Sequence, residues 1–218
     1  MQTIKLAAEE AVKSVKDGFT IGIGTSDYAI DVIKALKEKI LHEDIKVAVC
    51  PPSLRIANLL SEFKIDAAAL EDTPLDLTIE FAARADKEFN FIKTDTDSLI
   101  RDKMLALSSN KNIIIVDSAE PVEILNGVTP FEVSAFAVKS TLRALQELGR
   151  NTTIRKERGK TFITEESNII IDVDINPDLD IFEIDEISRK IPGVLETGIF
   201  EDIATKAIFL GPRTKQKL

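Results

Sequence analysis

The chain has few of the residues that form covalent cross-links or bind soft metals. Among its 218 residues there is one cysteine, Cys50, which excludes an internal disulfide, and one histidine, His42, which leaves too few ligands for a zinc site. No run of about 18 uncharged apolar residues is present, so we expect no membrane span. The first segment, MQTIKLAAEEAVKSVKDG, has acids on an amphipathic pattern, which argues against a signal peptide and for a cytoplasmic protein.

Basic residues are also fewer than acidic residues. The formal net charge is −9 at pH 7, whereas a protein that binds nucleic acid needs a basic face, so we expect no nucleic-acid partner. Apolar residues make up 44% of the chain and charged residues 30%. This composition is ordinary for a globular protein that can bury a core.

Helical and strand-like segments alternate through the first half of the chain. Apolar residues at helical spacing predict helices over 3–16, 28–40, 53–62 and 97–108. Apolar runs predict strands over 19–24, 45–50, 64–70, 75–81 and 112–117. Continuously apolar strands are typical of a parallel sheet covered on both faces. We therefore predict an α/β fold with a doubly wound, mostly parallel, Rossmann-like sheet.

From about Gly127 the pattern changes to strand, helix, two strands, helix and strand, over residues 130–200. The order β-α-β-β-α-β is that of a ferredoxin-like α+β unit. A last apolar segment, TKAIFLGP, predicts a strand that returns to the first sheet. We predict one domain formed by residues 1–127 plus 204–218, and a small ferredoxin-like domain formed by residues 128–203.

The turn after the first predicted strand resembles a phosphate-binding turn but contains an acidic residue. Residues 21–30 read IGIGTSDYAI, in which an apolar strand enters a Gly-x-Gly-Thr turn and a helix follows. Such turns bind phosphate, because glycines bring backbone N–H groups close to an anion at a helix N-terminus. Here the turn ends in Asp27, whose carboxylate would repel a phosphate by roughly 1 kcal/mol in water and by more when partly buried.

Several longer segments occur in an order and at a spacing that belong together. They are GFTIGIGT, IRDKMLAL, NIIIVDSAEPVEILNG, PFEVSAFAVKSTLRALQELG, NIIIDVDI and IPGVLETGIF followed by KAIFLGP. These segments resemble the type A ribose-5-phosphate isomerase family over nearly the whole chain. The IPGV…TGIF stretch is specific to that family, whereas the Gly-x-Gly-Thr turn alone would be a weak signal.

The resemblance implies the fold described above, a homodimer, no metal or other cofactor, and a small-molecule ligand such as a sugar phosphate. Such enzymes interconvert ribose 5-phosphate and ribulose 5-phosphate by a carboxylate that moves a proton between C1 and C2. The positions that match the family's catalytic residues are Asp102, Glu80 and Lys93, and those that match its substrate-binding loops include Gly24, Thr25, Ser26, Asp27 and Asp95.

The substrate-binding loops depart from the family pattern. The pattern Gly-x-Gly-Thr-Gly-Ser-Thr is kept as far as Thr25 and then replaced by Ser26, Asp27 and Tyr28. A Ser-Ser pair is replaced by PPS, in which Pro52 lacks an N–H.

The catalytic segments depart as well. The motif Asp-Gly-Ala-Asp-Glu is replaced by EFAAR, so its first acid becomes Glu80 and its second becomes Ala83. Lys-Gly-Gly-Gly becomes KTDT, which keeps Lys93 and adds Asp95. Asp102 takes the place of the catalytic Glu with a shorter reach, and a displacement of about 1 Å can cost on the order of 100-fold in rate. The lysine of Asp-Ala-Ser-Lys becomes Glu120, which reverses a charge.

Each departure also has an ordinary structural explanation. Asp27 could cap the following helix, exclude a phosphate, or do both. Lys93 and Asp102 could be a retained site or a leftover surface pair. Tyr28 is more often a packing residue than a stacking platform.

Changes in separate segments that meet at one family site outweigh any single change. We therefore hypothesise a divergent homologue in which isomerase activity is weak or lost and the pocket has been adapted to another ligand. One alternative is a functional isomerase of the pentose phosphate pathway that uses Asp102 as the base. Another is an enzyme or binding protein for a small polyol or a cationic metabolite, with an acidic pocket formed by Asp27, Glu80, Asp95, Asp102 and Glu120.

Overall fold

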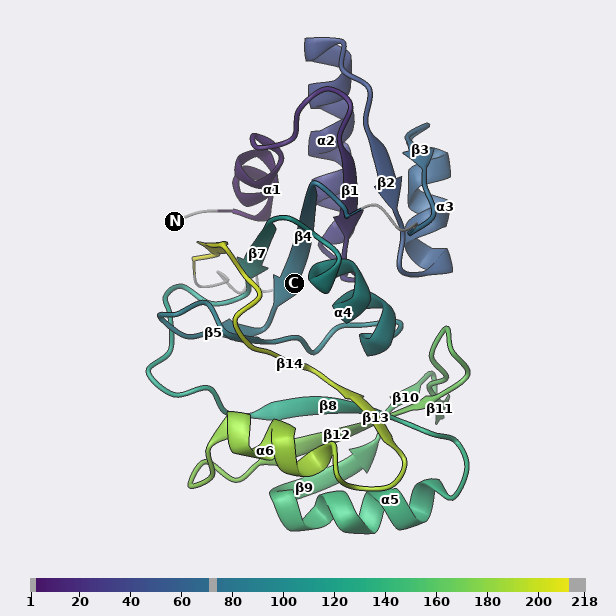
Figure 1. Cartoon of the computed structure of the whole chain (residues 1–218), viewed down its shortest axis with the longest axis vertical. Coiled ribbons are helices and arrows are strands. Elements are labelled where there is room, and N and C mark those ends of the chain that lie inside the picture. The colour runs from purple at the N-terminus through teal and green to yellow at the C-terminus, as the bar shows by residue number, and fades with distance from the viewer. Residues whose placement is uncertain (1–2, 71–73, 212–218) are drawn as a thin grey trace, which may run out of the picture.

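The computed structural model describes residues 3–70 and 74–211, and its core is a six-stranded parallel sheet (Figure 1). The strand order is β15-β7-β4-β1-β2-β3. The strands are β1 (Thr20–Ile23), β2 (Ala48–Cys50), β3 (Asp66–Ala67), β4 (Leu77–Ala82), β7 (Asn112–Val116) and β15 (Lys206–Phe209). Every neighbouring pair in this sheet is parallel, which confirms the predicted α/β class and its mostly parallel sheet.

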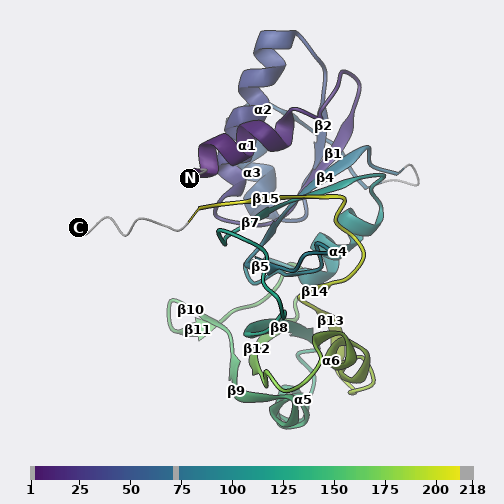
Figure 2. The same cartoon turned by 90° about the vertical axis from the view of Figure 1, so that its left-hand side faces the viewer.

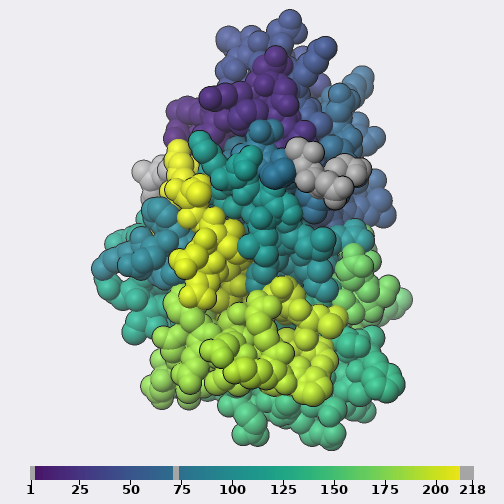
Figure 3. All heavy atoms as spheres, viewed as in Figure 1, coloured from purple at the N-terminus to yellow at the C-terminus, as the bar shows by residue number. Residues whose placement is uncertain are grey.

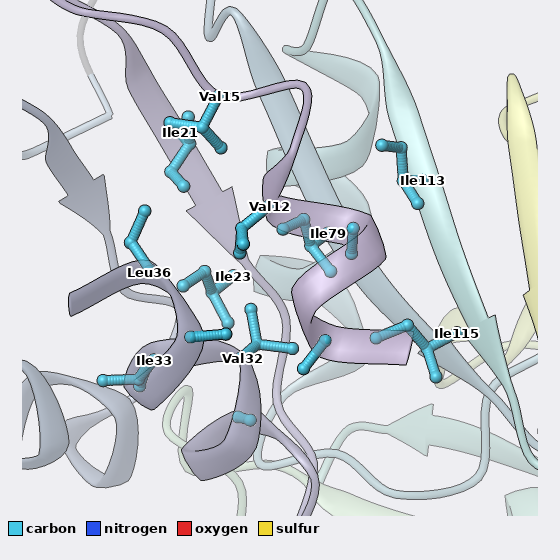
Figure 4. Packing of buried hydrophobic residues seen from close by; sticks show 14 of the residues in the cluster. Val12, Val15, Ile21, Ile23, Val32, Ile33, Leu36, Ile79, Ile113 and Ile115 are labelled. Carbon is cyan, nitrogen blue, oxygen red and sulfur yellow. The ribbon is translucent and has the colours of Figure 1, made fainter. Parts of the chain in front are cut away.

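Helices cover both faces of this sheet, as the continuously apolar strands required. They are α1 (Ile4–Val12), α2 (Ala29–Glu43), α3 (Leu54–Glu62) and α4 (Leu99–Leu107). Apolar side chains of β1, β4 and β7 pack against α1 and α2 in one core cluster (Figure 4). On the opposite face, the Thr78 hydroxyl donates to the Leu105 carbonyl oxygen of α4. Because side chains alternate along a strand, Glu80 also faces α4.

A second, antiparallel sheet lies at the other end of the molecule (Figure 1). Its order is β13-β8-β12-β9, with strands β8 (Val128–Val133), β9 (Gly149–Ile154), β12 (Ile169–Ile175) and β13 (Val194–Thr197). Helices α5 (Val138–Leu145) and α6 (Ile181–Ser188) connect the strands, with a 3-10 turn at Gln146–Leu148. The chain order β8-α5-β9-β12-α6-β13 is the predicted ferredoxin-like β-α-β-β-α-β unit.

A small three-stranded sheet lies between the two larger sheets (Figures 1 and 2). It contains β5 (Arg84–Ala85), β6 (Phe91–Ile92) and β14 (Ile199–Phe200), none of which the sequence predicted as a separate strand. The Phe91 and Phe200 rings stack with centroids 4.6 Å apart. A further hairpin is formed by β10 (Lys156–Glu157) and β11 (Lys160–Thr161).

The end of the chain crosses from the second sheet back to the first. After β14, the segment drawn in yellow runs over the surface (Figure 3), and β15 pairs in parallel with β7 (Figure 2). The division into residues 1–127 plus 204–218 and residues 128–203 stays a prediction. Residues 1–2, 71–73 and 212–218 lie outside the described part of the chain.

Candidate functional site

The turn between β1 and α2 lies against the charged centre of the molecule. Gly24 follows β1, and its N–H donates to the Ile79 carbonyl oxygen of β4 at 2.9 Å. A Cβ atom at Gly24 would lie 2.1 Å from Oε2 of Glu80, so any other residue would have to displace the Glu80 carboxylate. The glycine of the Gly-x-Gly-Thr turn therefore makes room for a carboxylate of the chain itself.

Glu80, Lys93 and Asp102 form one fully buried cluster, which we call the buried triad. The Lys93 ammonium lies 2.8 Å from Oε2 of Glu80 and 3.5 Å from Oδ2 of Asp102, and the three side chains are at most 1% exposed. The structure thus brings the three predicted catalytic positions together, and the interpretation of Lys93 and Asp102 as a surface pair is wrong. Whether these residues have a catalytic role stays a prediction.

Each member of the buried triad is placed by a different element. Glu80 comes from β4, and Asp102 comes from the first turn of α4, a helix that Ser98 caps. Lys93 directly follows β6, where its N–H donates to the Gly198 carbonyl oxygen at 2.8 Å. Gly198 lets the two segments approach each other here, since a Cβ atom at Gly198 would lie 2.5 Å from the Lys93 carbonyl oxygen.

The buried triad holds the Gly-x-Gly-Thr turn through the backbone of Thr25. Oδ1 of Asp102 accepts from the Thr25 N–H at 3.0 Å, and Lys93 donates to the Thr25 carbonyl oxygen at 2.8 Å. The Thr96 hydroxyl donates to Oδ2 of Asp102 at 2.7 Å. These bonds occupy both oxygens of the Asp102 carboxylate with groups of the protein.

Burial dominates the electrostatics of the buried triad. It raises the pKa of Glu80 to about 7, against the lowering effect of Lys93. It also raises the pKa of Asp102, where Lys93 and the hydrogen bond from Thr96 oppose it. Burial disfavours the charge on Lys93, but the two carboxylates outweigh it and hold the pKa of Lys93 above its ordinary value. Two carboxylates share one ammonium, so the triad is neutral only when one carboxyl group carries a proton.

A second charged cluster lies at the rim of the turn, centred on Arg55 in the first turn of α3. We call it the Arg55 cluster. The guanidinium binds three aspartates, with NH1 2.9 Å from Asp27, NH2 3.2 Å from Asp95 and Nε 3.0 Å from Asp97. Asp27 is therefore not the cap of α2. The N-cap residue of α2 is Tyr28, whose side chain makes no capping hydrogen bond, and the Asp27 carboxylate bonds to Arg55 instead.

A cavity of about 290 Å³ opens beside these clusters, at the edge of the sheet where parallel strands end. It is lined by Ser26, Asp27, Tyr28, Phe81, Ala82, Ala83, Thr94, Asp95 and Asp117. Of the predicted substrate-binding residues, Ser26, Asp27 and Asp95 line the cavity.

Other predicted site residues do not reach it. Gly24, Thr25, Glu80, Lys93 and Asp102 are absent from the lining, so the cavity contains only part of the predicted site. The physical reason is that Lys93 and Asp102 bond to the Thr25 backbone and are fully buried. Glu120 is exposed and does not line the cavity either, so the predicted pocket of five acids is not formed.

Three charged residues of the site were missed by the sequence analysis. Asp117 follows the carboxyl end of β7, and Tyr28 donates to it at 3.2 Å. Its place after a buried parallel strand is a signal that could have identified it. Asp97 belongs to the same acidic segment as Asp95, which was also visible. No local pattern marks Arg55.

Within residues 3–70 and 74–211, no helix is long and apolar enough to cross a membrane. In the same part of the chain, no group of three or more His, Cys, Asp or Glu side chains is arranged to hold a metal ion.

The chain was compared with known proteins. Residues 48–214 match the family described as Ribose 5-phosphate isomerase A (phosphoriboisomerase A). The ribose-5-phosphate isomerase A of Brucella suis biovar 1 is 35% identical over 213 residues, which cover 94% of this chain and 91% of the relative.

Solved structures agree with the sequence matches. The ribose 5-phosphate isomerase from Plasmodium falciparum superposes with a TM-score of 0.89 at 28% identity, and the alignment covers 95% of this chain and 93% of that one. Ribose 5-phosphate isomerase A from Methanocaldococcus jannaschii gives a TM-score of 0.83 at 32% identity, with 97% and 95% covered. These matches confirm the resemblance that the sequence segments indicated.

Proposed function

The chain belongs to the ribose 5-phosphate isomerase A family, and we propose that it is a member in which the isomerase activity is weak or absent and the cavity binds a small molecule without a phosphate group. The observation that carries this proposal is the burial of Asp102. A general base must come within about 2.6–3.2 Å of the proton that it removes. Asp102 is 0% exposed and does not line the cavity, and both of its oxygens accept hydrogen bonds from Thr25 and Thr96.

The charge of the cavity supports the second half of the proposal. Its described lining includes Asp27, Asp95 and Asp117 and no lysine or arginine. A phosphate dianion would meet like charges there, and each charge-assisted hydrogen bond that it fails to make forgoes roughly 1.5–3 kcal/mol. A neutral polyol or a cationic metabolite suits this lining better, because carboxylates accept hydrogen bonds from hydroxyl and ammonium groups.

One observation favours the alternative of a functional isomerase that acts on ribose 5-phosphate with Asp102 as the base. Glu80, Lys93 and Asp102 remain in one cluster, and burial raises the pKa of Glu80 to about 7, near the value that general acid–base catalysis favours. For this cluster to act, the turn around Thr25 would have to open. The cytoplasmic location and the homodimer implied by the family belong to the proposal in either case.

The test is a coupled assay for ribulose 5-phosphate, with a known ribose-5-phosphate isomerase run alongside. We expect turnover near background, because Asp102 is fully buried and is absent from the lining of the cavity. The triple variant Ser26→Gly, Asp27→Ser, Tyr28→Thr should not restore turnover, since the other segments are unchanged. Wild-type turnover of even about 10 per second, a common enzyme rate, would overturn the proposal and favour the functional isomerase.

A thermal-shift screen tests the ligand class. Millimolar ribose 5-phosphate should leave the melting temperature unchanged, whereas an uncharged polyol or an amine that binds should raise it. A rise with ribose 5-phosphate and with no phosphate-free compound would contradict the proposal.

A further inference from the structure

Three backbone N–H groups of the turn between β1 and α2 donate to side-chain oxygens of the protein itself. The Thr25 N–H donates to Oδ1 of Asp102 at 3.0 Å, the Asp27 N–H donates to Oδ2 of Asp95 at 2.8 Å, and the Tyr28 N–H donates to the Ser26 hydroxyl at 3.2 Å. A glycine-containing turn at the N-terminus of a helix is a common place for proteins to bind an anion. In this turn, two carboxylates of the chain itself take that place.

Asp95 is held in this position from its other side. Its Oδ1 lies 3.2 Å from NH2 of Arg55, while its Oδ2 accepts from the Asp27 backbone. The same guanidinium binds the Asp27 and Asp97 carboxylates. The contacts come from α3, from the turn after β1 and from the segment before α4, so one arginine fixes three segments at the rim of the cavity.

We propose that the Asp95 carboxylate, fixed by Arg55, is an internal anion that fills the turn and makes the site reject ligands bearing phosphate. Asp95 and Asp27 are then specificity-determining residues. This inference deepens the proposed function and rests on it, because it names the residues that restrict the ligand class. It does not depend on whether the buried triad is active.

The charge balance of the Arg55 cluster explains the rejection. One guanidinium faces three carboxylates, which leaves two negative charges unbalanced at the rim. A phosphate that enters the turn would have to displace Asp95 from the Asp27 N–H and then remain beside it. The phosphate and the Asp95 carboxylate would then be neighbouring negative charges, which repel each other in a partly buried site. Removal of two of the carboxylates would leave Arg55 paired with Asp97 and would free donors on both the guanidinium and the turn.

The experiment is a gain of phosphate binding in the double variant Asp27→Ser, Asp95→Ala. Inorganic phosphate is titrated into the protein at low salt by isothermal titration calorimetry. We expect the double variant to bind phosphate at least about tenfold more tightly than the wild type, because an N–H group and guanidinium donors become available together. Adding Arg55→Gln to the double variant should abolish the gain.

A matched control separates local geometry from net charge. Arg101 is 39% exposed, close to the 36% of Arg55, and it pairs with Glu165 and Glu166. The variant Glu165→Gln, Glu166→Gln removes the same number of negative charges and frees donors of Arg101. Glu165 also accepts from the Leu54 N–H at the start of α3, but the amide oxygen of the replacing side chain can still accept this bond, so the control frees no backbone N–H group. It should not bind phosphate more tightly than the wild type.

Folding of each variant is checked by near-ultraviolet circular dichroism and urea unfolding. If the double variant does not fold, Asp27→Asn, Asp95→Asn, which keeps the shapes of both side chains and removes both charges, replaces it with the same expectation. No gain of phosphate binding in a folded variant, or an equal gain in the Glu165, Glu166 control, would overturn the inference. Wild-type isomerase turnover would instead contradict the proposed function and would leave the phosphate titration to decide this one.

Discussion

Ionisation of Glu80 should make the fold less stable as the pH rises toward neutrality. The carboxyl group is fully buried, and burial raises its pKa from 4.5 to about 7, with Lys93 opposing this effect. Between these two pKa values the folded protein holds a proton that the unfolded chain has released. The free energy of unfolding therefore falls as the pH rises through this range.

The size of the effect follows from the two pKa values. Each pH unit between 4.5 and about 7 lowers the free energy of unfolding by about 1.4 kcal/mol, so the loss across the range is about 3 kcal/mol. Above about pH 7 this contribution is constant, and below pH 4.5 it is absent. Asp102, whose pKa burial also raises, acts with the same sign. Replacing Glu80 with Gln should remove most of this pH dependence.

The measurement is urea unfolding of the wild type and of Glu80→Gln at pH 5, 6, 7 and 8. Glu10→Gln is the control, because hydrogen bonds from Lys13 and Lys206 lower the pKa of Glu10 to about 2 and its titration lies below this range. We expect the wild type and the control to lose stability between pH 5 and 7, and Glu80→Gln to lose much less. The reasoning is refuted if Glu80→Gln keeps the wild-type slope, or if wild-type stability rises over this interval.

Three further substitutions test the packing of the charged centre, each by urea unfolding at pH 7. Lys93→Met should lower the free energy of unfolding by about 3–5 kcal/mol, because it leaves two buried carboxyl groups without their cation, and a loss below 1 kcal/mol would contradict this. Gly24→Ala should cost about 1–3 kcal/mol, since the added Cβ would lie 2.1 Å from Oε2 of Glu80, and an unchanged free energy of unfolding would contradict this close packing. Glu132 of β8 is fully buried and accepts hydrogen bonds from the Ser98 and Thr164 hydroxyls, the Ile100 N–H and the Asn168 amide. Glu132→Ala should cost more than about 3 kcal/mol by leaving these donors unpaired, whereas Glu132→Gln should cost less, and equal losses would argue against the hydrogen bonds as the cause.

The main sheet could be predicted because its strands are apolar on both faces. The run NIIIV of β7 is buried throughout, and such runs stand out from their surroundings in the sequence. The small sheet of β5, β6 and β14 could not be predicted in this way. Its strands have two residues each, which is too short for a periodic pattern, and β14 pairs with a strand more distant in sequence.

The site was predictable where it follows from a strand or from the family resemblance. Glu80, Lys93 and Asp102 were identified in this way, and the structure brings them together. Arg55 had no such signal, because its aspartate partners are 28, 40 and 42 residues away along the chain. Of the two roles considered for Asp27, the helix cap is not formed for the same reason: its carboxylate makes a long-range ion pair with Arg55 instead.

The backbone of the turn connects the two charged clusters. Thr25 accepts from Lys93 and donates to Asp102, and two residues later the Asp27 N–H donates to Asp95 of the Arg55 cluster. A proton gained or lost by the buried triad changes the charge that faces Thr25, and a carboxylate displaced from Arg55 releases the same short segment at its other end. Since each cluster bonds to the turn separately, a ligand that displaced only Asp95 would still find Asp102 bonded to Thr25. We therefore expect that access to the buried triad requires both sets of contacts to break, so that a ligand can bind in the cavity without isomerisation.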